Sequence, residues 1–467
     1  EIYTLSLHDA LPIWSAETFS NVVAQINSFV WGPWMLALLV GTGILLTIRL
    51  KFLQFFSLPY ALKLAFGPRN QDSRSKGDIS HFQALMTALA ATIGTGNIVG
   101  VSTAVVAGGP GAVFWMWITA IFGMATKYGE AVLAVKYRIV DEKGEMAGGP
   151  MYYIERGMGV KWLAVLFAVF ASVAAFGIGN IVQSNSVAGA VKDIFGISPL
   201  WTGLVLAAFT ALVILGGVKS IGRVSGVIVP LMAVFYVFCA LFIVFSNLDK
   251  VPAAFGEIFR GAFSLQAGLG ALLGTAIRFG VARGVFSNEA GLGSAPIAAA
   301  AAKTDHPCRQ ALVSMTGTFL DTIVVCTMTG LSLVMAGLHS CTEAAESASL
   351  TGRSFEVFLP GVGSTLVTVA LIFFAYSTIL GWSYYGEKSF YYLVGQKGIF
   401  WYRLAFSILV FVGANIKLQM AWDIADTFNG AMAIPNLIAL IALSGVVVRE
   451  TVEFKGIRAQ EKIDEGK

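Results

Sequence analysis

Apolar residues run along this chain in stretches long enough to cross a lipid bilayer, and short polar segments separate them. A transmembrane helix needs about 20 mostly apolar residues. The stretches are residues 29–48, 82–106, 112–135, 162–190, 200–216, 224–246, 262–282, 311–337, 363–393, 399–416 and 429–448. The pattern predicts an all-α integral membrane protein with about eleven transmembrane helices, of which 200–216 is short for a span.

Lysine and arginine are concentrated in every second connection between these stretches. The connection after residues 29–48 holds six of them, between Arg49 and Lys76, whereas the connection before residues 112–135 holds none. The alternation continues through all eleven stretches. Because basic connections stay in the cytoplasm, we expect a multi-pass protein of the cell (plasma) membrane, with its N-terminus outside and its C-terminus in the cytoplasm.

The composition agrees with a chain that uses the bilayer as solvent. Only 12% of the 467 residues are charged and the mean hydropathy is +0.75, whereas soluble domains carry about 25% charged residues. The four cysteines are scattered and are expected to fill apolar space, and the four unclustered histidines argue against a metal centre. The net charge of +4 does not point to nucleic acid as a partner. Residues 1–14 resemble translated adapter DNA, and we expect them to be a non-native N-terminal scar.

Two of the predicted spans contain runs that interrupt a helix. A GTGN run at residues 94–97 lies near the middle of the second span. Gly268, Gly270 and Gly274 lie in the seventh, and they are followed by Arg278, Arg283, the run Ser287–Asn288–Glu289 and another glycine cluster. Unwound residues expose backbone N–H and C=O groups that a ligand can satisfy in mid-membrane. The alternative for such small residues is close packing of helices. An amide side chain beside the glycines favours a binding site.

The two interrupted spans lie five helices apart and run in opposite directions. This is the plan of carriers built from two inverted five-helix repeats, here preceded by one extra helix. The plan divides the chain into an accessory helix with a basic cytoplasmic loop (15–81), a first repeat (82–246), a second repeat (262–449) and a cytoplasmic tail (450–467).

Polar side chains inside the predicted spans need either partners or a function. Gln183 is a ligand candidate, with hydrogen bonding between helices as the alternative. The adjacent hydroxyls of Ser377 and Thr378 suit sodium, although they could bond back to carbonyls of their own helix. Asp321 is either functional or a structural hydrogen-bond hub. Glu130 lies near the end of its span, and we expect it to snorkel or to pair with a loop.

Five separated segments together resemble one transporter family. They are GTGNIVGV, AGGPMYYIERGMG, GNIVQSNSVA, FSNEAGLGSAPIAAAAA and YSTILGWSYYGEKS. In this order they resemble the alanine/glycine:cation symporter family, over nearly all of the chain from Phe29 to Arg449. The resemblance implies the leucine-transporter-type fold and sodium-driven uptake of alanine and glycine. It also implies that sodium is a co-transported ligand and that no cofactor is needed.

The resemblance further implies roles for individual residues. Backbone N–H groups would meet the substrate carboxylate, an amide would contact its polar end, and two rings would close its apolar side. The residues of this substrate site are Gly94, Thr95, Gly96, Asn97, Gln183, Phe279 and Trp382. Carbonyl and hydroxyl oxygens would hold sodium, from Ala90, Ile93, Phe374, Ser377 and Thr378.

Other functions fit the sequence less well. An intramembrane enzyme needs a nucleophile–base pair or a metal motif, and neither HExxH nor GxSxG occurs. A channel uses rings of charge or of carbonyls, usually in a symmetric oligomer, whereas one long chain with an internal repeat favours a carrier. The alternative that stays open is a carrier of the same architecture that is driven by protons or carries another small solute.

Overall fold

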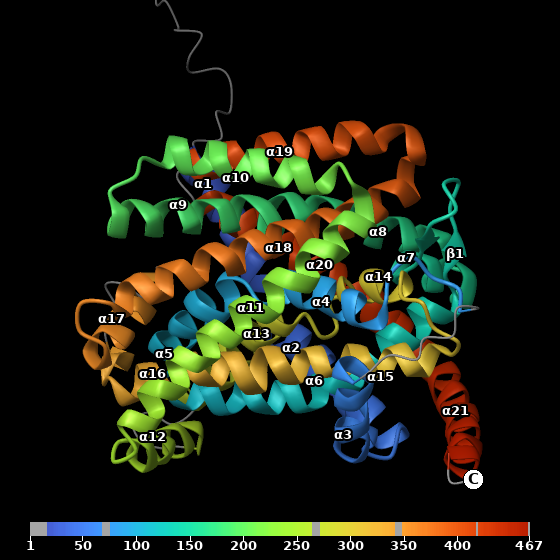
Figure 1. Ribbon diagram of the computed structural model, residues 1–467, viewed down its shortest axis with the longest axis horizontal. Coiled ribbons are helices and arrows are strands. Elements are labelled where there is room, and N and C mark those ends of the chain that lie inside the picture. The colour runs from blue at the N-terminus through green and yellow to red at the C-terminus, as the bar shows by residue number, and fades with distance from the viewer. Residues whose placement is uncertain (1–15, 68–74, 264–270, 341–347, 417–418, 466–467) are drawn as a thin grey trace, which may run out of the picture.

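The computed structural model describes residues 16–67, 75–263, 271–340, 348–416 and 419–465, which are almost entirely helical. Long helices lie side by side along the longest axis of the molecule (Figure 1). A short antiparallel hairpin pairs β1 (Ile139–Val140) with β2 (Met146–Ala147) at one end. The all-α prediction is confirmed, while the predicted N-terminal scar lies outside the described residues.

The helices follow one another with short connections. Those of the first half are α1 (Ala16–Val30), α2 (Pro33–Arg49), α3 (Leu53–Phe66), α4 (His81–Thr92), η2 (Gly96–Gly100), α5 (Val101–Gly108), α6 (Gly111–Lys136), α7 (Pro150–Tyr153), η3 (Ile154–Met158), α8 (Lys161–Phe176), η4 (Gly177–Ile181), α9 (Val182–Phe195), α10 (Pro199–Ile214) and α11 (Gly217–Ser246). Those of the second half are α12 (Val251–Phe263), α13 (Ala271–Asn288), α14 (Ala295–Ala300), α15 (Pro307–Thr318), η5 (Phe319–Cys326), α16 (Thr327–Met335), η6 (Leu338–Ser340), α17 (Ala348–Phe358), α18 (Gly363–Val394), η7 (Gln396–Gly398), α19 (Ile399–Asn415), α20 (Gln419–Ala442) and α21 (Ser444–Glu465).

Ten of the eleven predicted spans coincide with helices of the described structure. Within the described residues, eight helices are long and apolar enough to cross a membrane, or nine if the bent pair around residues 93–95 counts as one span. The short stretch 200–216 corresponds to α10, an apolar helix of 16 residues. The stretch 262–282 falls partly on residues 264–270, outside the described part of the chain, as do Gly268 and Gly270.

One face of α11 shows how the molecule meets lipid. Leu231, Val234, Phe238 and Phe245 recur at helical spacing and are each at least 64% exposed. Large apolar side chains on the outside of a helix are stable where hydrocarbon replaces water.

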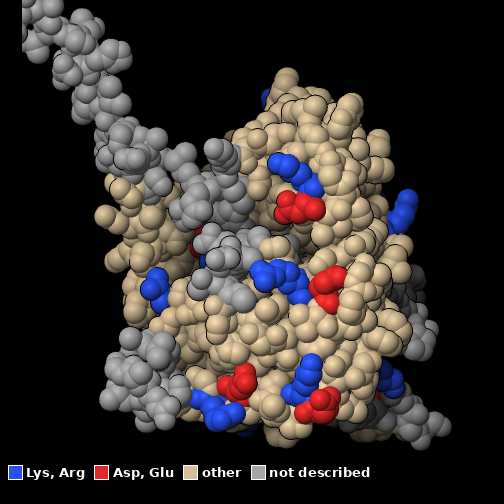
Figure 2. Space-filling view, turned by 90° about the vertical axis from the view of Figure 1, so that its left-hand side faces the viewer, with Lys and Arg blue, Asp and Glu red and all other residues tan. Residues whose placement is uncertain are grey.

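Seen from the end where α12 and α17 lie, charged side chains stand singly or in small groups on a largely uncharged surface (Figure 2).

The segment predicted as a cytoplasmic tail is helical. α20 ends at Ala442, and α21 follows after Leu443 as a separate helix (Figure 1). Ion pairs tie α21 to the rest of the protein, from Lys136 Nζ to Glu450 Oε1 and from Arg309 Nη2 to Glu461 Oε1, each at 2.5 Å. The tail is therefore a docked helix.

Two interrupted helices pass through the interior. α4 and the segment Gly96–Gly108 meet at an angle of 53° around Ile93, whose backbone is extended. α13 and α14 are separated by residues 289–294, in which Glu289, Gly291 and Gly293 have positive φ angles. The described break thus falls at Glu289 and the glycine cluster that follows it, which the sequence includes in the second interruption, whereas Gly268 and Gly270 lie outside the described residues.

Candidate functional site

A side chain from the break itself, that of Asn97, bonds the backbone of the first helix break. Ser80 and Gln83 form a capping box at the start of α4, and the helix ends at Thr92. The N–H of Gly94 then donates to Oδ1 of Asn97 at 2.8 Å. Asn97 therefore caps the backbone that the break exposes, which is the role that a short amide performs at a helix end.

Gln183 on α9 contacts the same break. Its Oε1 accepts from the Thr95 N–H at 3.2 Å, and its Nε2 donates to Thr95 Oγ1 at 3.0 Å. The π turn η4 precedes Gln183, and Nε2 also donates to Ile178 O of that turn at 3.0 Å. The structure thus brings Gln183 to the break, as the sequence predicts, across 88 residues of chain.

Five oxygen atoms converge on the other side of this break. Thr378 Oγ1 lies 3.3 Å from Ile93 O, and Ser377 Oγ lies 3.3 Å from Ala90 O. Both hydroxyls also contact Phe374 O, at 2.9 Å and 2.8 Å. Hard oxygen ligands in a compact group are what a hard cation such as sodium requires. The bonds to Phe374 O show that back-bonding, the alternative interpretation, is present in the same group.

Gly94 is the point where the two groups of ligands meet. A Cβ atom at Gly94 would lie 2.4 Å from Thr378 Oγ1 and 3.3 Å from Gln183 Oε1. A larger residue would therefore separate α18 from the break. The glycine is needed for this close approach, because its own backbone does not require a positive φ.

Asp321 joins the two interrupted helices. Its Oδ1 accepts from Asn97 Nδ2 at 2.7 Å, and its Oδ2 accepts from Ser287 Oγ at 2.9 Å. Thr322 Oγ1 also donates to Oδ2 at 2.7 Å. Asp321 lies in the π turn η5 and is fully buried. It is a hydrogen-bond hub, and because it contacts Asn97 it is also adjacent to the candidate site.

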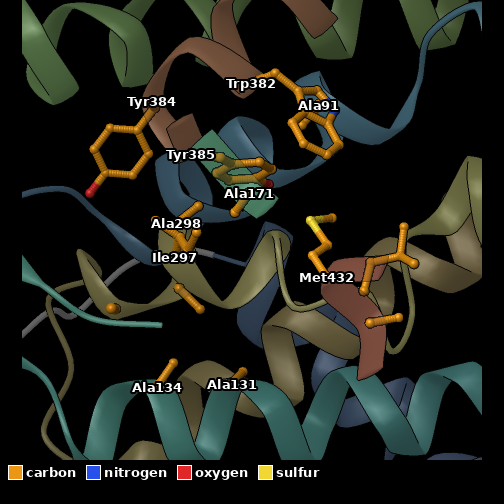
Figure 3. Close-up of a cluster of buried hydrophobic side chains, with 14 of the residues drawn as sticks. Ala91, Ala131, Ala134, Ala171, Ile297, Ala298, Trp382, Tyr384, Tyr385 and Met432 are labelled. Atoms are coloured by element: carbon orange, nitrogen blue, oxygen red, sulfur yellow. The ribbon is translucent and has the colours of Figure 1, made fainter. Parts of the chain in front are cut away.

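The two predicted rings lie in different surroundings. Trp382 on α18 is 2% exposed, lies beside Ala91 of α4, and contacts Tyr385 edge-on with ring centroids 5.7 Å apart (Figure 3). Phe279 on α13 lines a cavity of about 80 Å³ together with Trp31 and Arg283. The described residues that line this cavity include none from α18. Trp382 therefore lies beside the first break, whereas Phe279 lines a cavity that borders the break through Phe286, 3.2 Å from where a Cβ atom at Gly96 would lie.

Glu130 was expected to snorkel or to pair with a loop, and it pairs with the loop after α13 without reaching the surface. Its side chain is 0% exposed, and its Oε1 accepts from Gly291 N–H at 3.1 Å and Gly293 N–H at 3.2 Å. Lys127, one turn earlier, is 4% exposed. The charged pair at this spacing inside an apolar run is the sequence signal that could have indicated a buried cluster.

A second polar cavity lies at the end of the molecule that carries the β hairpin. It has a volume of about 140 Å³ and is lined by residues of the hairpin, α18 and α19. Lys388 Nζ bonds Asp141 Oδ2 at 3.0 Å and Glu145 Oε2 at 3.2 Å, and Arg403 pairs with Glu387 at 2.6 Å. The ion pairs of Lys388 connect the hairpin to α18, and the pair between Arg403 and Glu387 connects α18 to α19.

The half-buried residue Asp78 also connects the hairpin to the start of α4. Its Oδ2 accepts from the Met146 N–H at 2.7 Å. Burial raises the pKa of Asp78, and the hydrogen bond from Met146 opposes that rise. The segment before the first interrupted helix is therefore anchored at this end.

Comparisons with known proteins agree on a single group. The sequence profile of the sodium:alanine symporter family matches residues 16–466. The sodium/alanine symporter AgcS of Methanococcus maripaludis is 66% identical over 449 residues, which cover 95% of this chain and 99% of that protein. A probable sodium/glutamine symporter, GlnT of Bacillus subtilis, is 39% identical over 432 residues, covering 92% and 90% of the two chains.

A solved structure supports the fold independently. The crystal structure of MhsT in complex with L-phenylalanine superposes with a TM-score of 0.56 at 13% sequence identity, covering 81% of this chain and 99% of that one. An identity this low shows the fold alone, which is of the leucine-transporter type. The fold that the sequence resemblance implied is therefore confirmed.

Proposed function

Because the chain belongs to the sodium:alanine symporter family, it is a membrane transporter with sodium as co-transported ion, and we propose that it carries alanine and glycine by alternating access. The observation that supports the proposal is the convergence of three groups at one helix break. These are backbone N–H groups that the helix break frees from helical bonds, an amide side chain and five oxygens suited to sodium.

Two side-chain oxygens indicate how a substrate carboxylate would bind. Oδ1 of Asn97 accepts from Gly94 N–H, and Oε1 of Gln183 accepts from Thr95 N–H. A carboxylate carries two such oxygens, so it could replace both acceptors, and Gly96 continues the same backbone. The half-helix that starts here adds a partial positive charge that favours an anion. The released Gln183 amide oxygen would then be available to the substrate ammonium.

Sodium would bind between α4 and α18, at Ala90, Ile93, Phe374, Ser377 and Thr378. An ion there would tie the broken helix to α18 and fix the arrangement that the substrate needs, so the two ligands would bind cooperatively. Moving one positive charge through the membrane potential yields about 2.3 kcal/mol per 100 mV. Since about 1.4 kcal/mol is a tenfold ratio, the ion can drive accumulation of a neutral zwitterion.

Burial of the site supports alternating access. Thr95, Asn97, Gln183, Ser377 and Thr378 are each no more than 2% exposed. A ligand at this depth can enter or leave only if helices move apart. The five-helix repeats, 82–246 and 262–449, are the units that we propose to move, with the basic connections on the cytoplasmic side of the cell membrane.

The relatives differ in the amino acid that their names give as substrate, so they do not decide the substrate of this chain. One relative is called an alanine symporter and another a probable glutamine symporter. A carrier driven by protons, or one for another small solute, remains the alternative. We propose a small pocket because Trp382 is large, buried and pressed against Gly179, where a Cβ atom would lie 2.0 Å from that of Trp382.

Competition for labelled alanine uptake tests the cargo. Glycine and alanine should compete well, leucine and glutamine poorly, since each added methylene changes apolar fit by about 1–3 kcal/mol. Trp382→Ala should admit leucine, and Phe279→Ala should change selection less. Ethylamine should not compete, because it has no carboxylate. Leucine that competes as strongly as alanine in the wild type would refute the small pocket, and strong competition by ethylamine would refute the carboxylate site.

A further inference from the structure

A group of charged residues is buried next to the second helix break. Lys127 and Glu130 on α6 are 4% and 0% exposed, and Glu289 at the break is 2% exposed. None of these belongs to the alanine or sodium sites proposed above. Ionised groups away from water cost several kcal/mol each unless partners compensate them. Buried charge inside a membrane span is therefore a candidate for function.

The hydrogen bonds to Glu130 are divided unequally between its two oxygens. Oε1 accepts from Gly291 N–H at 3.1 Å, Gly293 N–H at 3.2 Å and Asn436 Nδ2 at 2.7 Å. Oε2 is fully buried and has no hydrogen-bond partner among the residues that the structure describes. Oε1 therefore accepts three hydrogen bonds and Oε2 accepts none. This arrangement suits a protonated carboxylic acid that carries its proton on Oε2.

The charges around Glu130 do not cancel. The titratable groups that face it or its immediate neighbours are Lys127 on α6, Tyr153 on α7, Glu289 at the break and Tyr385 on α18. Both tyrosines are neutral near pH 7. Lys127 therefore offers one positive charge to Glu130, Glu289 and the more distant Asp321. A proton on Glu130 would remove part of this excess negative charge.

The bonds of Glu130 hold the loop that connects α13 to α14. Gly291 and Gly293 have φ angles of +94° and +86°, and a Cβ atom at Gly293 would lie 2.7 Å from Pro150 Cγ. The same loop follows Ser287 of α13, whose Oγ donates to Asp321 Oδ2 at 2.9 Å, and Asp321 Oδ1 accepts from Asn97 of the substrate site at 2.7 Å. The protonation state of Glu130 can therefore affect the substrate site through this loop.

We propose that Glu130 is a proton-binding site, separate from the sodium site, whose occupancy controls the mobility of the second helix break. An ionised Glu130 makes charge-assisted bonds to Gly291 and Gly293, about twice as strong as neutral ones, and so fixes the loop. A protonated Glu130 holds the loop more weakly. Transport requires the break to move, so protonation should speed transport, and Glu130→Gln should imitate the protonated form.

Two measurements on the full-length protein in proteoliposomes test the proposal. The first is alanine uptake at saturating sodium from pH 5.5 to pH 9. Wild-type uptake should fall with rising pH by about fivefold or more, whereas Glu130→Gln should stay fast and vary less than about twofold. Glu142→Gln, at an exposed position of the hairpin turn, should follow the wild type.

The second measurement is the infrared absorption of protonated carboxylic acids during a pH titration. The wild type should show an acid C=O band that disappears as uptake falls, and Glu130→Gln should lack it. Glu130→Asp should keep such a band with a displaced midpoint, which tests the site if the glutamine variant folds poorly. A wild type without a Glu130-dependent band, or a Glu130→Gln variant with wild-type pH dependence, would overturn the proposal. Either failure would leave sodium-dependent alanine uptake, and hence the proposed function, untouched.

Discussion

At the scale of single residues, the site depends on one close approach. Gly94 lets Thr378 on α18 reach the first break, and a Cβ atom there would lie 2.4 Å from Thr378 Oγ1. Gly94→Ala should therefore reduce alanine uptake at least tenfold, because overpacking at a buried contact costs about 1–3 kcal/mol. Gly100→Ala, where a Cβ atom would meet nothing within 4 Å, is the matched control. Equal uptake by the two variants would contradict this account of Gly94.

Residue types indicated which side chains come together at the first break, while their roles in binding stay predictions. The GTGN run, Gln183 and the hydroxyl pair Ser377–Thr378 meet as predicted, because their polar atoms have few alternatives inside an apolar span. Glu130 pairs with a loop, as one alternative had it, but its burial and its partner were not predicted, because Gly291 lies 161 residues away and only the folded chain brings them together. Phe279 lines a cavity without described residues of α18, since the orientation of one ring on α13 depends on packing that periodicity does not describe.

At the scale of elements, the helices that fall on described residues and the first break were recovered, and the glycine cluster after Glu289 also interrupts a helix. A glycine-rich run shows that a helix can be interrupted, but the interruption forms where partners satisfy the freed backbone. At the second break these partners are Glu130 and Asn436, which no local pattern reveals. The helix α21 was missed for a similar reason, because its ion pairs to α6 and α15 join distant parts of the chain.

The two broken helices are coupled to each other through Asp321. Asp321→Asn would replace one acceptor oxygen by an amide group that cannot accept from both Asn97 and Ser287. The free energy of unfolding of the variant should be about 1–3 kcal/mol lower than that of the wild type. The variant should also lose alanine uptake. Chemical denaturation in detergent and uptake in proteoliposomes check both effects. Asp193→Asn, at an exposed position of α9, should be neutral, and an equally neutral Asp321→Asn would contradict the coupling.

At the scale of the whole molecule, basic connections gather at one end. Arg138 Nη2 donates to Lys76 O at 2.9 Å, and Arg309 pairs with Glu461 of α21. The hairpin, α3 and α21 lie at this end (Figure 1). The charge alternation predicts that it faces the cytoplasm. A reporter enzyme fused after α21 should therefore be active when it requires the cytoplasm, and activity restricted to the outside would invert the topology.

The placement of sodium between the first break and α18 is the central claim, and one measurement tests it most directly. Alanine uptake is followed as external sodium replaces choline, in the wild type and in the double variant Ser377→Ala with Thr378→Val. The two hydroxyl oxygens that the variant lacks each lie 3.3 Å from a backbone carbonyl oxygen at the end of α4, Ala90 O or Ile93 O. The account predicts that the sodium concentration for half-maximal uptake rises at least about tenfold, equal to a loss of roughly 1.4 kcal/mol, while alanine selectivity at saturating sodium is retained. An unchanged sodium requirement in the double variant would contradict it.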